Sequence, residues 1–182
     1  HFSNEFSNSP LTMKEVYIAL AKEGNSIDPS TLRALTFNGK KEVTLSRGQA
    51  IVSDPVQFTM QARSSISITI NYGQTPPDVT GHPGSRTTSF LMTGNQATNA
   101  DFANAIPTDH WYTIRGIDVK APSKAAAISI VGNSITDGRG SGTNKQNRWP
   151  DILSEQLQKN PETAQIAVLN QGIGGNCVLR NC

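Results

Sequence analysis

The residues with the greatest potential for chemistry lie where apolar, β-prone runs end in small residues. Residues 128–131 form such a run, and Ser134 follows it within three positions, which places its hydroxyl at the carboxyl end of a predicted strand. A second run at 166–170 ends in a glycine-rich segment that contains Gly175. Open α/β sheets bind their ligands beyond the carboxyl ends of the strands. If the two strands are parallel neighbours, Ser134 is a candidate nucleophile, and the second loop supplies backbone N–H donors.

Three sequence blocks around these residues resemble the SGNH (GDSL-like) hydrolase superfamily of lipases and esterases. The family's first block, Gly-Asp-Ser-x-Thr-Asp-Gly, stands here as Gly-Asn-Ser-Ile-Thr-Asp-Gly at 132–138. Its second, a strand leading into an Asn-x-Gly-Ile-x-Gly-Asn type of loop, stands as Asn-Gln-Gly-Ile-Gly-Gly-Asn at 170–176. Arg-Trp-Pro at 148–150, at the start of the helix between them, is also similar. The three blocks occur in the family's order.

The resemblance implies a role for each of these positions. Ser134 would attack an ester carbonyl, and its own N–H and that of Gly175 would donate to the oxyanion. Asn133 stands where the family usually has Asp, a side chain that supports the loop. We expect Asn133 and Asn176 at the binding site, although an Asn in a loop is more often a turn former. No cofactor and no metal is implied.

The rest of the family's machinery is missing between residues 1 and 182. Neither a Gly-x-Asn-Asp block nor an Asp-x-x-His pair follows the second block, and none of His1, His82 and His110 matches the position of the family's base. A serine without its imidazole retains only a small part of its catalysis. We therefore expect this chain to be truncated at both ends and nearly inert alone. The missing part would be a C-terminal remainder of the same protein, possibly present as a second chain.

Several alternatives to the hydrolase site remain open. Ser134 could be a turn residue or a helix cap, and Gly175 a turn glycine selected for its positive φ. Thr136 stands where the nucleophile elbow of α/β-hydrolases requires glycine, and 138–142 does not have the spacing of a phosphate-binding loop. His82 is most simply a surface-loop residue and otherwise a contact at the binding site. A non-catalytic carbohydrate- or surface-binding module, or a pseudoenzyme, are the alternative functions.

Residues 1–122 are typical of a β-sandwich, similar to a jelly roll, because short β-prone runs alternate with turn residues. The segment Ser3-Asn4-Glu5-Phe6 with Pro10-Leu11 is similar to one in the N-terminal sandwich of some secreted SGNH esterases. Asn38-Gly39 predicts a type I′ hairpin turn. The predicted strands cover residues 16–20, 35–37, 43–45, 49–52, 56–60, 66–72, 87–92, 111–114 and 117–119, with a bulge at Gly116.

Residues 123–182 change to a strand–helix–strand pattern, which predicts the first part of a three-layer α/β hydrolase domain. The helix is expected over 147–160, with Trp149, Ile152, Leu153 and Leu157 on one buried stripe. One helix cannot cover both faces of a parallel sheet, so we expect this part not to fold alone. The polar loop at 138–146 would form the rim of the active-site cleft.

Composition bears on three questions: nucleic-acid binding, membrane spanning and the redox compartment of the protein. The net charge of +2 and the lack of a Lys/Arg cluster give no electrostatic support for nucleic-acid binding. The longest apolar run, 125–132, is too short to span a bilayer. Cys177 and Cys182 are close enough for a local disulfide, which would suit a secreted protein, although unpaired thiols or distant partners are also possible. Two cysteines without a neighbouring His do not indicate a zinc site.

Overall fold

The computed structural model of the chain describes residues 1–177 and 179, and these form mostly β-strands with few helices. The elements are β1 (Phe2–Ser3), β2 (Leu11–Leu20), η1 (Pro29–Thr31), β3 (Arg33–Leu35), β4 (Val43–Leu45), β5 (Ala50–Ile51), β6 (Ile66–Tyr72), β7 (Gly81–His82), β8 (Ser89–Leu91), β9 (Ile106–Thr108), β10 (Trp111–Tyr112), β11 (Ala126–Gly132), α1 (Ser134–Asp137), α2 (Trp149–Gln158) and β12 (Ile166–Gly172). The predicted β-rich character is confirmed.

The chain divides into two compact units whose sequences interleave. Unit 1 comprises residues 1–81, 90–108 and 112–118, and unit 2 comprises 82–89, 109–111 and 119–182. The short segments 82–89 and 109–111 therefore group with the C-terminal part of the chain. The division at residue 122 into two domains stays a prediction, because compactness of contacts does not test whether a segment folds by itself.

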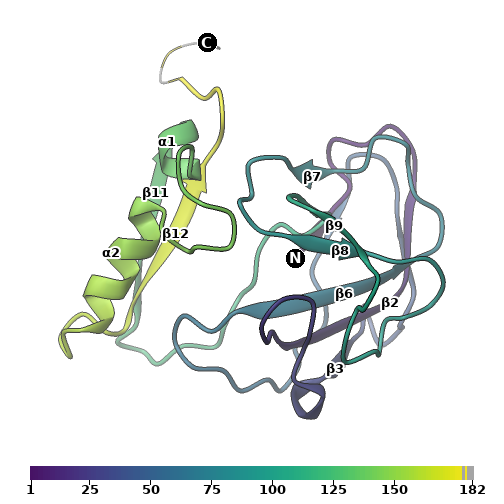
Figure 1. Cartoon of the computed structure of the whole chain (residues 1–182), viewed down its shortest axis with the longest axis horizontal. Helices are drawn as coiled ribbons and strands as arrows, with labels where there is room; N and C mark the ends of the chain where they lie inside the picture. Colours follow the sequence, from purple (N-terminus) through teal and green to yellow (C-terminus); the bar gives the residue numbers. More distant parts are fainter. Residues whose placement is uncertain (178, 180–182) are drawn as a thin grey trace. The chain divides into compact units, whose positions relative to one another are not determined.

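Strand β2 organises unit 1. It pairs antiparallel with β3, β4 and β6, and β2 and β6 run beside each other over most of their length (Figure 1). The apolar side chains of β2 point into the core, whose buried residues are Phe2, Leu11, Met13, Val16, Ile18, Leu35, Phe37 and Leu45. Burial of such side chains contributes about 1.5–3 kcal/mol each, so β2 supplies a large share of the stability of this unit.

The alternating run at 66–72 is confirmed as β6 with its predicted bounds. Its apolar members Ile66, Ile68, Ile70 and Tyr72 pack against the buried core. The Tyr72 hydroxyl lies 2.9 Å from the Thr113 hydroxyl, and burial raises the pKa of Tyr72 to about 12. Period-2 alternation thus identified both the strand and the face that packs against the core.

The Asn38-Gly39 turn is confirmed, but the hairpin around it is much shorter than predicted. Both residues have positive φ, 52° and 77°, as a type I′ turn requires. The turn closes only the Phe37–Lys40 bridge, and β3 and β4 each pair with β2 and not with each other. A long central strand offers more hydrogen bonds and a larger apolar face than a short hairpin partner.

Some predicted strands of residues 1–122 are absent from the structure, and some observed strands were not predicted. Residues 56–60 and 117–119 form no strand, so no bulge arises at Gly116, whereas β1, β7 and β9 were not predicted. Val56 and Phe58 nevertheless pack against the core, which explains their apolar character without strand pairing. The largest sheet has four strands and the others two each, so the jelly-roll arrangement stays a prediction.

In unit 2, β11 and β12 are parallel neighbours, as the site hypothesis requires, and α2 packs against β12 (Figure 1). The buried stripe predicted for the helix is wrong at Trp149 and Ile152 of α2, whose side chains are 46% and 43% exposed. Both strands are also largely exposed. Leu153 and Leu157 are half-buried, and only Pro150 of this helix is buried. One ten-residue helix cannot cover both faces of the strand pair.

Removal of a central core side chain should destabilise the chain strongly. Leu11 in β2 is completely buried, and truncation of such a Leu leaves a cavity. We expect Leu11→Ala to lower the free energy of unfolding by about 2–5 kcal/mol. Urea denaturation followed by circular dichroism measures this loss. Val52, which is 53% exposed, provides the control, since Val52→Ala should change stability by no more than about 0.5 kcal/mol. Equal effects of both variants would contradict the assignment of the core.

Asp54 should make the stability of the turn at 36–39 depend on pH. Its carboxylate accepts hydrogen bonds from the Thr36 hydroxyl (2.6 Å) and from the Gly39 N–H (2.8 Å). The Thr36 bond, followed by the Gly39 bond, lowers the pKa of Asp54. A lowered folded-state pKa gives a stability that is present above the unfolded pKa and is lost as pH falls through the folded one. The difference in melting temperature between wild type and Asp54→Asn should therefore shrink on acidification below the pKa of a free Asp. A difference that is constant between neutral and strongly acidic pH would refute this.

Candidate functional site

The loops after β11 and β12 begin at the same level of the strand pair. Gly132 is the register partner of Gly172, and these are the last residues of their strands. The N–H of Ile173 donates to the Gly132 carbonyl over 3.0 Å and joins the two loops at their start. The segments that carry Ser134 and Gly175 therefore leave the sheet side by side.

Ser134 is the first residue of the four-residue helix α1. Asn133 caps this helix, with its side-chain oxygen accepting from the Ile135 N–H at 3.1 Å. The first N–H groups of a helix lack intrahelical acceptors, so the Ser134 N–H is available to a ligand. The Ser134 hydroxyl is half-buried and makes no hydrogen bond to any described residue. The helix cap is therefore Asn133 and not Ser134, which was the alternative that the sequence left open for the serine.

Two glycines allow α1 to lie against the strand ends. A Cβ on Gly172 would overlap the backbone nitrogen of Asp137, and one on Gly132 would overlap the Thr136 side chain. The Asn170 amide in β12 also donates to the Thr136 carbonyl over 2.8 Å. The glycines at these two strand ends are therefore required for packing and do not merely terminate the strands.

The second loop is a turn around Gly175. This glycine has φ 78°, is exposed, and has no atom within 4 Å of the position of a Cβ. The Asn176 N–H donates to the Ile173 carbonyl over 3.1 Å and closes the turn, and the Asn176 side chain is exposed. The turn-glycine interpretation is confirmed, while the roles of the Gly175 N–H and of Asn176 toward a substrate stay predictions.

The three histidines of the chain each have a partner other than Ser134. His1 Nε2 lies 2.8 Å from Asp118 Oδ2, and His110 Nδ1 lies 2.9 Å from the Pro83 carbonyl. His82 Nε2 lies 2.7 Å from Asp137 Oδ1, with the side chains 35% and 10% exposed. His82 is thus not the free surface-loop residue that the sequence favoured. Its partner comes from the same helix as Ser134.

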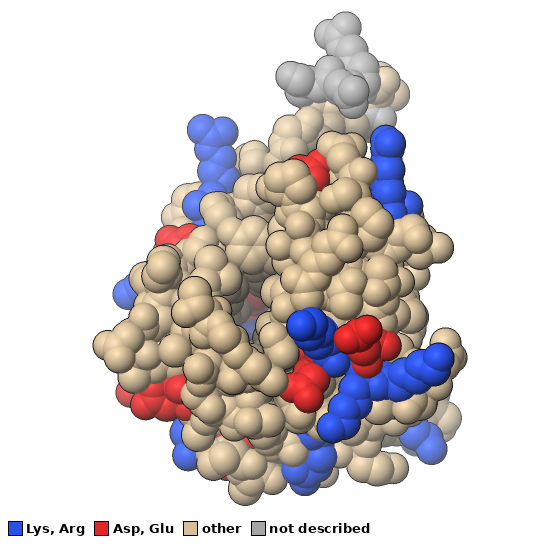
Figure 2. Space-filling view, turned by 90° about the vertical axis from the view of Figure 1, so that its right-hand side faces the viewer, with Lys and Arg blue, Asp and Glu red and all other residues tan. Residues whose placement is uncertain are grey.

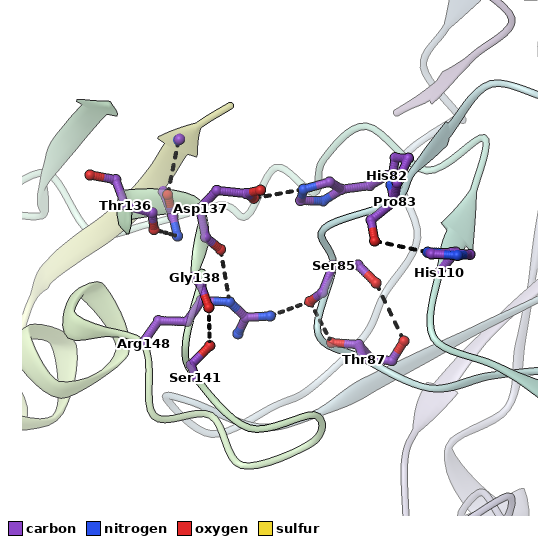
Figure 3. A network of polar contacts seen from close by, with 12 residues as sticks. His82, Pro83, Ser85, Thr87, His110, Thr136, Asp137, Gly138, Ser141 and Arg148 are labelled. Carbon is purple, nitrogen blue, oxygen red and sulfur yellow. Dashed lines mark hydrogen bonds and ion pairs between the residues drawn. The ribbon is translucent and has the colours of Figure 1, made fainter. Parts of the chain in front are cut away.

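A polar network in unit 2 ties the segment 82–89 to α1 and α2 (Figure 3). The Arg148 Nε donates to the Asp137 carbonyl at 3.2 Å, and another guanidinium nitrogen donates to the Ser85 carbonyl. At the start of α2, the Arg148 N–H and Nη1 donate to Asp151 Oδ2 over 3.0 and 3.2 Å. Sequence reasoning missed this network, because no local pattern relates residues 82–85 to 137 and 148.

The loop 138–148 is attached to the same segment. The Asn144 N–H donates to the Arg86 carbonyl over 2.9 Å, and the Asn144 side-chain oxygen accepts from the Thr88 N–H over 2.8 Å. Thr143 and Thr88 both direct their hydroxyls to the Asp109 carboxylate. Several hydrogen bonds therefore attach this polar loop to the segment 82–89 and to Asp109.

Other kinds of site are not evident among residues 1–177 and 179. These residues include no group of three His, Cys, Asp or Glu side chains that could hold a metal ion. On the face seen in Figure 2, acidic and basic side chains are interspersed without a large patch of one sign. None of the helices in this part of the chain is long and apolar enough to cross a membrane. The predicted Cys177–Cys182 bridge involves Cys182, which lies outside the described residues.

Comparisons with known proteins leave the family open. No family model and no curated protein matches the chain. Among solved structures, a carbohydrate esterase family 2 enzyme with a carbohydrate-binding domain from Corynascus thermopiles (Myceliophthora fergusii) is similar at 15% identity and a TM-score of 0.22. The match covers 95% of this chain and 44% of that one. A TM-score of this size defines neither the fold nor the activity.

Substitution of Gly172 should displace α1. In Gly172→Ala the new methyl group meets backbone and not a flexible side chain, so it cannot be accommodated by rotation. We expect a loss of about 1–3 kcal/mol in unfolding free energy and a change in the amide chemical shifts of α1. Gly116→Ala is the matched control, because nothing lies within 4 Å of its Cβ position. If Gly172→Ala were as stable as Gly116→Ala, the close approach of α1 to β12 would be wrong.

Proposed function

We propose that the chain is part of a secreted serine esterase of the SGNH type that hydrolyses acyl or acetyl esters, esters on carbohydrate among them. Ser134 attacks the ester carbonyl, and the N–H groups of Ser134 and Gly175 donate to the oxyanion. The observation that carries the proposal is the parallel register of Gly132 with Gly172, joined by the Ile173 hydrogen bond to the Gly132 carbonyl. It starts both predicted loops at one point of the sheet edge.

The surroundings of Ser134 and Gly175 support these roles. The Ser134 hydroxyl has no competing hydrogen bond among the described residues, and its N–H lies at the first position of α1, where a helix offers no intrahelical acceptor. Gly175 has no side chain to obstruct the approach of a substrate oxygen, and its positive φ suits glycine. Donors of this kind stabilise a developing oxyanion by about 3 kcal/mol each.

The general base belongs to a part of the protein outside residues 1–182. On the described residues each histidine has a partner other than Ser134, and the resemblance implies an Asp-x-x-His pair after the second block. The serine requires such an imidazole to accept its proton. We propose that the C-terminal remainder supplies this pair and a further oxyanion donor, in the same polypeptide or as a second chain. No metal or organic cofactor takes part in the proposed reaction.

Labelling with a fluorophosphonate tests the nucleophile. We expect the complete protein to be modified covalently at Ser134, as located by peptide mass spectrometry, and to hydrolyse aryl acetates. Ser134→Ala should abolish the labelling and lower kcat by at least about 10⁴-fold. Ser129→Ala is the control, because Ser129 is an exposed serine of β11, the strand that leads into the site.

Labelling at another serine would overturn the assignment of Ser134. An absence of both labelling and ester hydrolysis, together with binding to glycans, would favour a carbohydrate-binding module. If the protein is inactive and Asn133→Asp does not activate it, a pseudoenzyme is favoured.

A further inference from the structure

The Asp137 carboxylate is placed one helical turn after Ser134 and is only 10% exposed. A buried carboxylate is costly unless hydrogen-bonded partners compensate for its lost hydration. His82 Nε2 lies 2.7 Å from its Oδ1 and is a side-chain partner that this carboxylate has on the described residues. Gly84 adds a close fit, since a Cβ there would overlap Asp137 Oδ2. The turn at 82–84 is therefore shaped around this carboxylate.

The imidazole of His82 is itself held in place. Its ring packs edge-on against the indole of Trp111, with centroids 5.0 Å apart and planes at 71°. The Pro83 carbonyl accepts a hydrogen bond from His110 Nδ1 at 2.9 Å, which fixes the next residue of the turn. The contact with Trp111 restricts rotation of the His82 ring, whose Nε2 is directed at Asp137 (Figure 3).

Arg148 forms a second link between the same two segments. Its Nε donates to the Asp137 carbonyl, and its guanidinium reaches the Ser85 carbonyl, with the side chain 11% exposed. The segment 82–85 thus holds Asp137 by its carboxylate through His82 and by its backbone through Arg148. Both links lie within unit 2.

A helix of four residues cannot maintain its geometry by itself, because helix formation has an unfavourable nucleus. Ser134 and Asp137 face the same side of α1, three residues apart. Displacement of Asp137 therefore tilts the helix and moves the Ser134 hydroxyl. Misplacement of a reacting group by about 1 Å is sufficient to lower a rate by about 100-fold.

We infer that His82 is a positioning residue for Ser134: it donates its Nε2–H to Asp137 and so holds α1 in the orientation that the nucleophile requires. This inference rests on the proposed function. It makes a segment distant in sequence, 82–85, part of the esterase site. The role of His82 is to orient, and neither to accept the proton of the serine nor to contact the substrate.

Two substitutions separate the hydrogen bond from simple packing. The amide nitrogen of Gln reaches nearly the same position as Nε2 of His, so His82→Gln retains a donor to Asp137, whereas His82→Leu retains apolar volume and removes the donor. His1→Leu is the matched control, because the His1 ring pairs with Asp118, which lies outside both the turn at 82–84 and α1. All variants are made in the complete protein, and their melting temperatures are measured.

The first measurement is the rate at which a fluorophosphonate labels Ser134. This rate is separated into a binding constant and an inactivation constant. We expect the inactivation constant to fall by about 10- to 100-fold in His82→Leu with unchanged binding of the probe. Labelling in His82→Gln should be largely restored, and labelling in His1→Leu should equal wild type. Equal inactivation constants in wild type and His82→Leu would overturn the inference. So would an equal loss in the Leu and Gln variants, because it would show that only the imidazole's packing matters.

Amide hydrogen exchange of residues 134–138 is the second measurement and does not depend on esterase activity. Faster exchange in His82→Leu than in wild type and His82→Gln supports the positioning role, and equal exchange in all three contradicts it. If wild type is not labelled at Ser134, the proposed function fails. The exchange data then still decide whether His82 holds α1.

Discussion

The close approach of α1 to two strand-end glycines is the constraint on which the candidate site depends. Gly132 and Gly172 are register partners in parallel strands, and a side chain on either would occupy space that α1 fills. Since the helix has only four residues, its position follows from these contacts and from the Asn133 cap. The small size of two residues thus decides where Ser134 stands. The chemistry proposed for Ser134 requires this placement, because a nucleophile acts only when its geometry is held.

The site has a second set of supports that comes from far along the chain. His82 and the Ser85 carbonyl reach Asp137 and Arg148, and Asn144 attaches the loop 138–148 to the same segment. These bonds explain why residues 82–89 belong to the compact unit of the C-terminal part and not to the one formed around β2. The compact unit is thus defined by contacts between segments that are distant in sequence.

Sequence patterns identified elements whose environment is local. The alternation at 66–72 matched β6, and Asn38-Gly39 adopted the expected positive φ values, because side-chain period and turn conformation depend on adjacent residues. Sequence patterns did not predict strand pairing or burial where these depend on a partner distant in sequence. Leu35 and Val43 lie in strands that pair with β2 and not with each other, and Val56 and Phe58 fill the core without joining a strand. The apolar stripe of α2 was visible in the sequence, but its exposure depends on what else covers the strand pair.

The sequence by itself determined that a serine follows one β-run and a glycine-rich turn follows another, since residue type and spacing specify strand ends and turns locally. Only the tertiary structure decided that the two runs are parallel neighbours in register, and that His82 and Arg148 hold Asp137. The physical reason is that a hydrogen bond between side chains 55 residues apart leaves no periodicity in the chain, and exists only once folding has brought the two segments together.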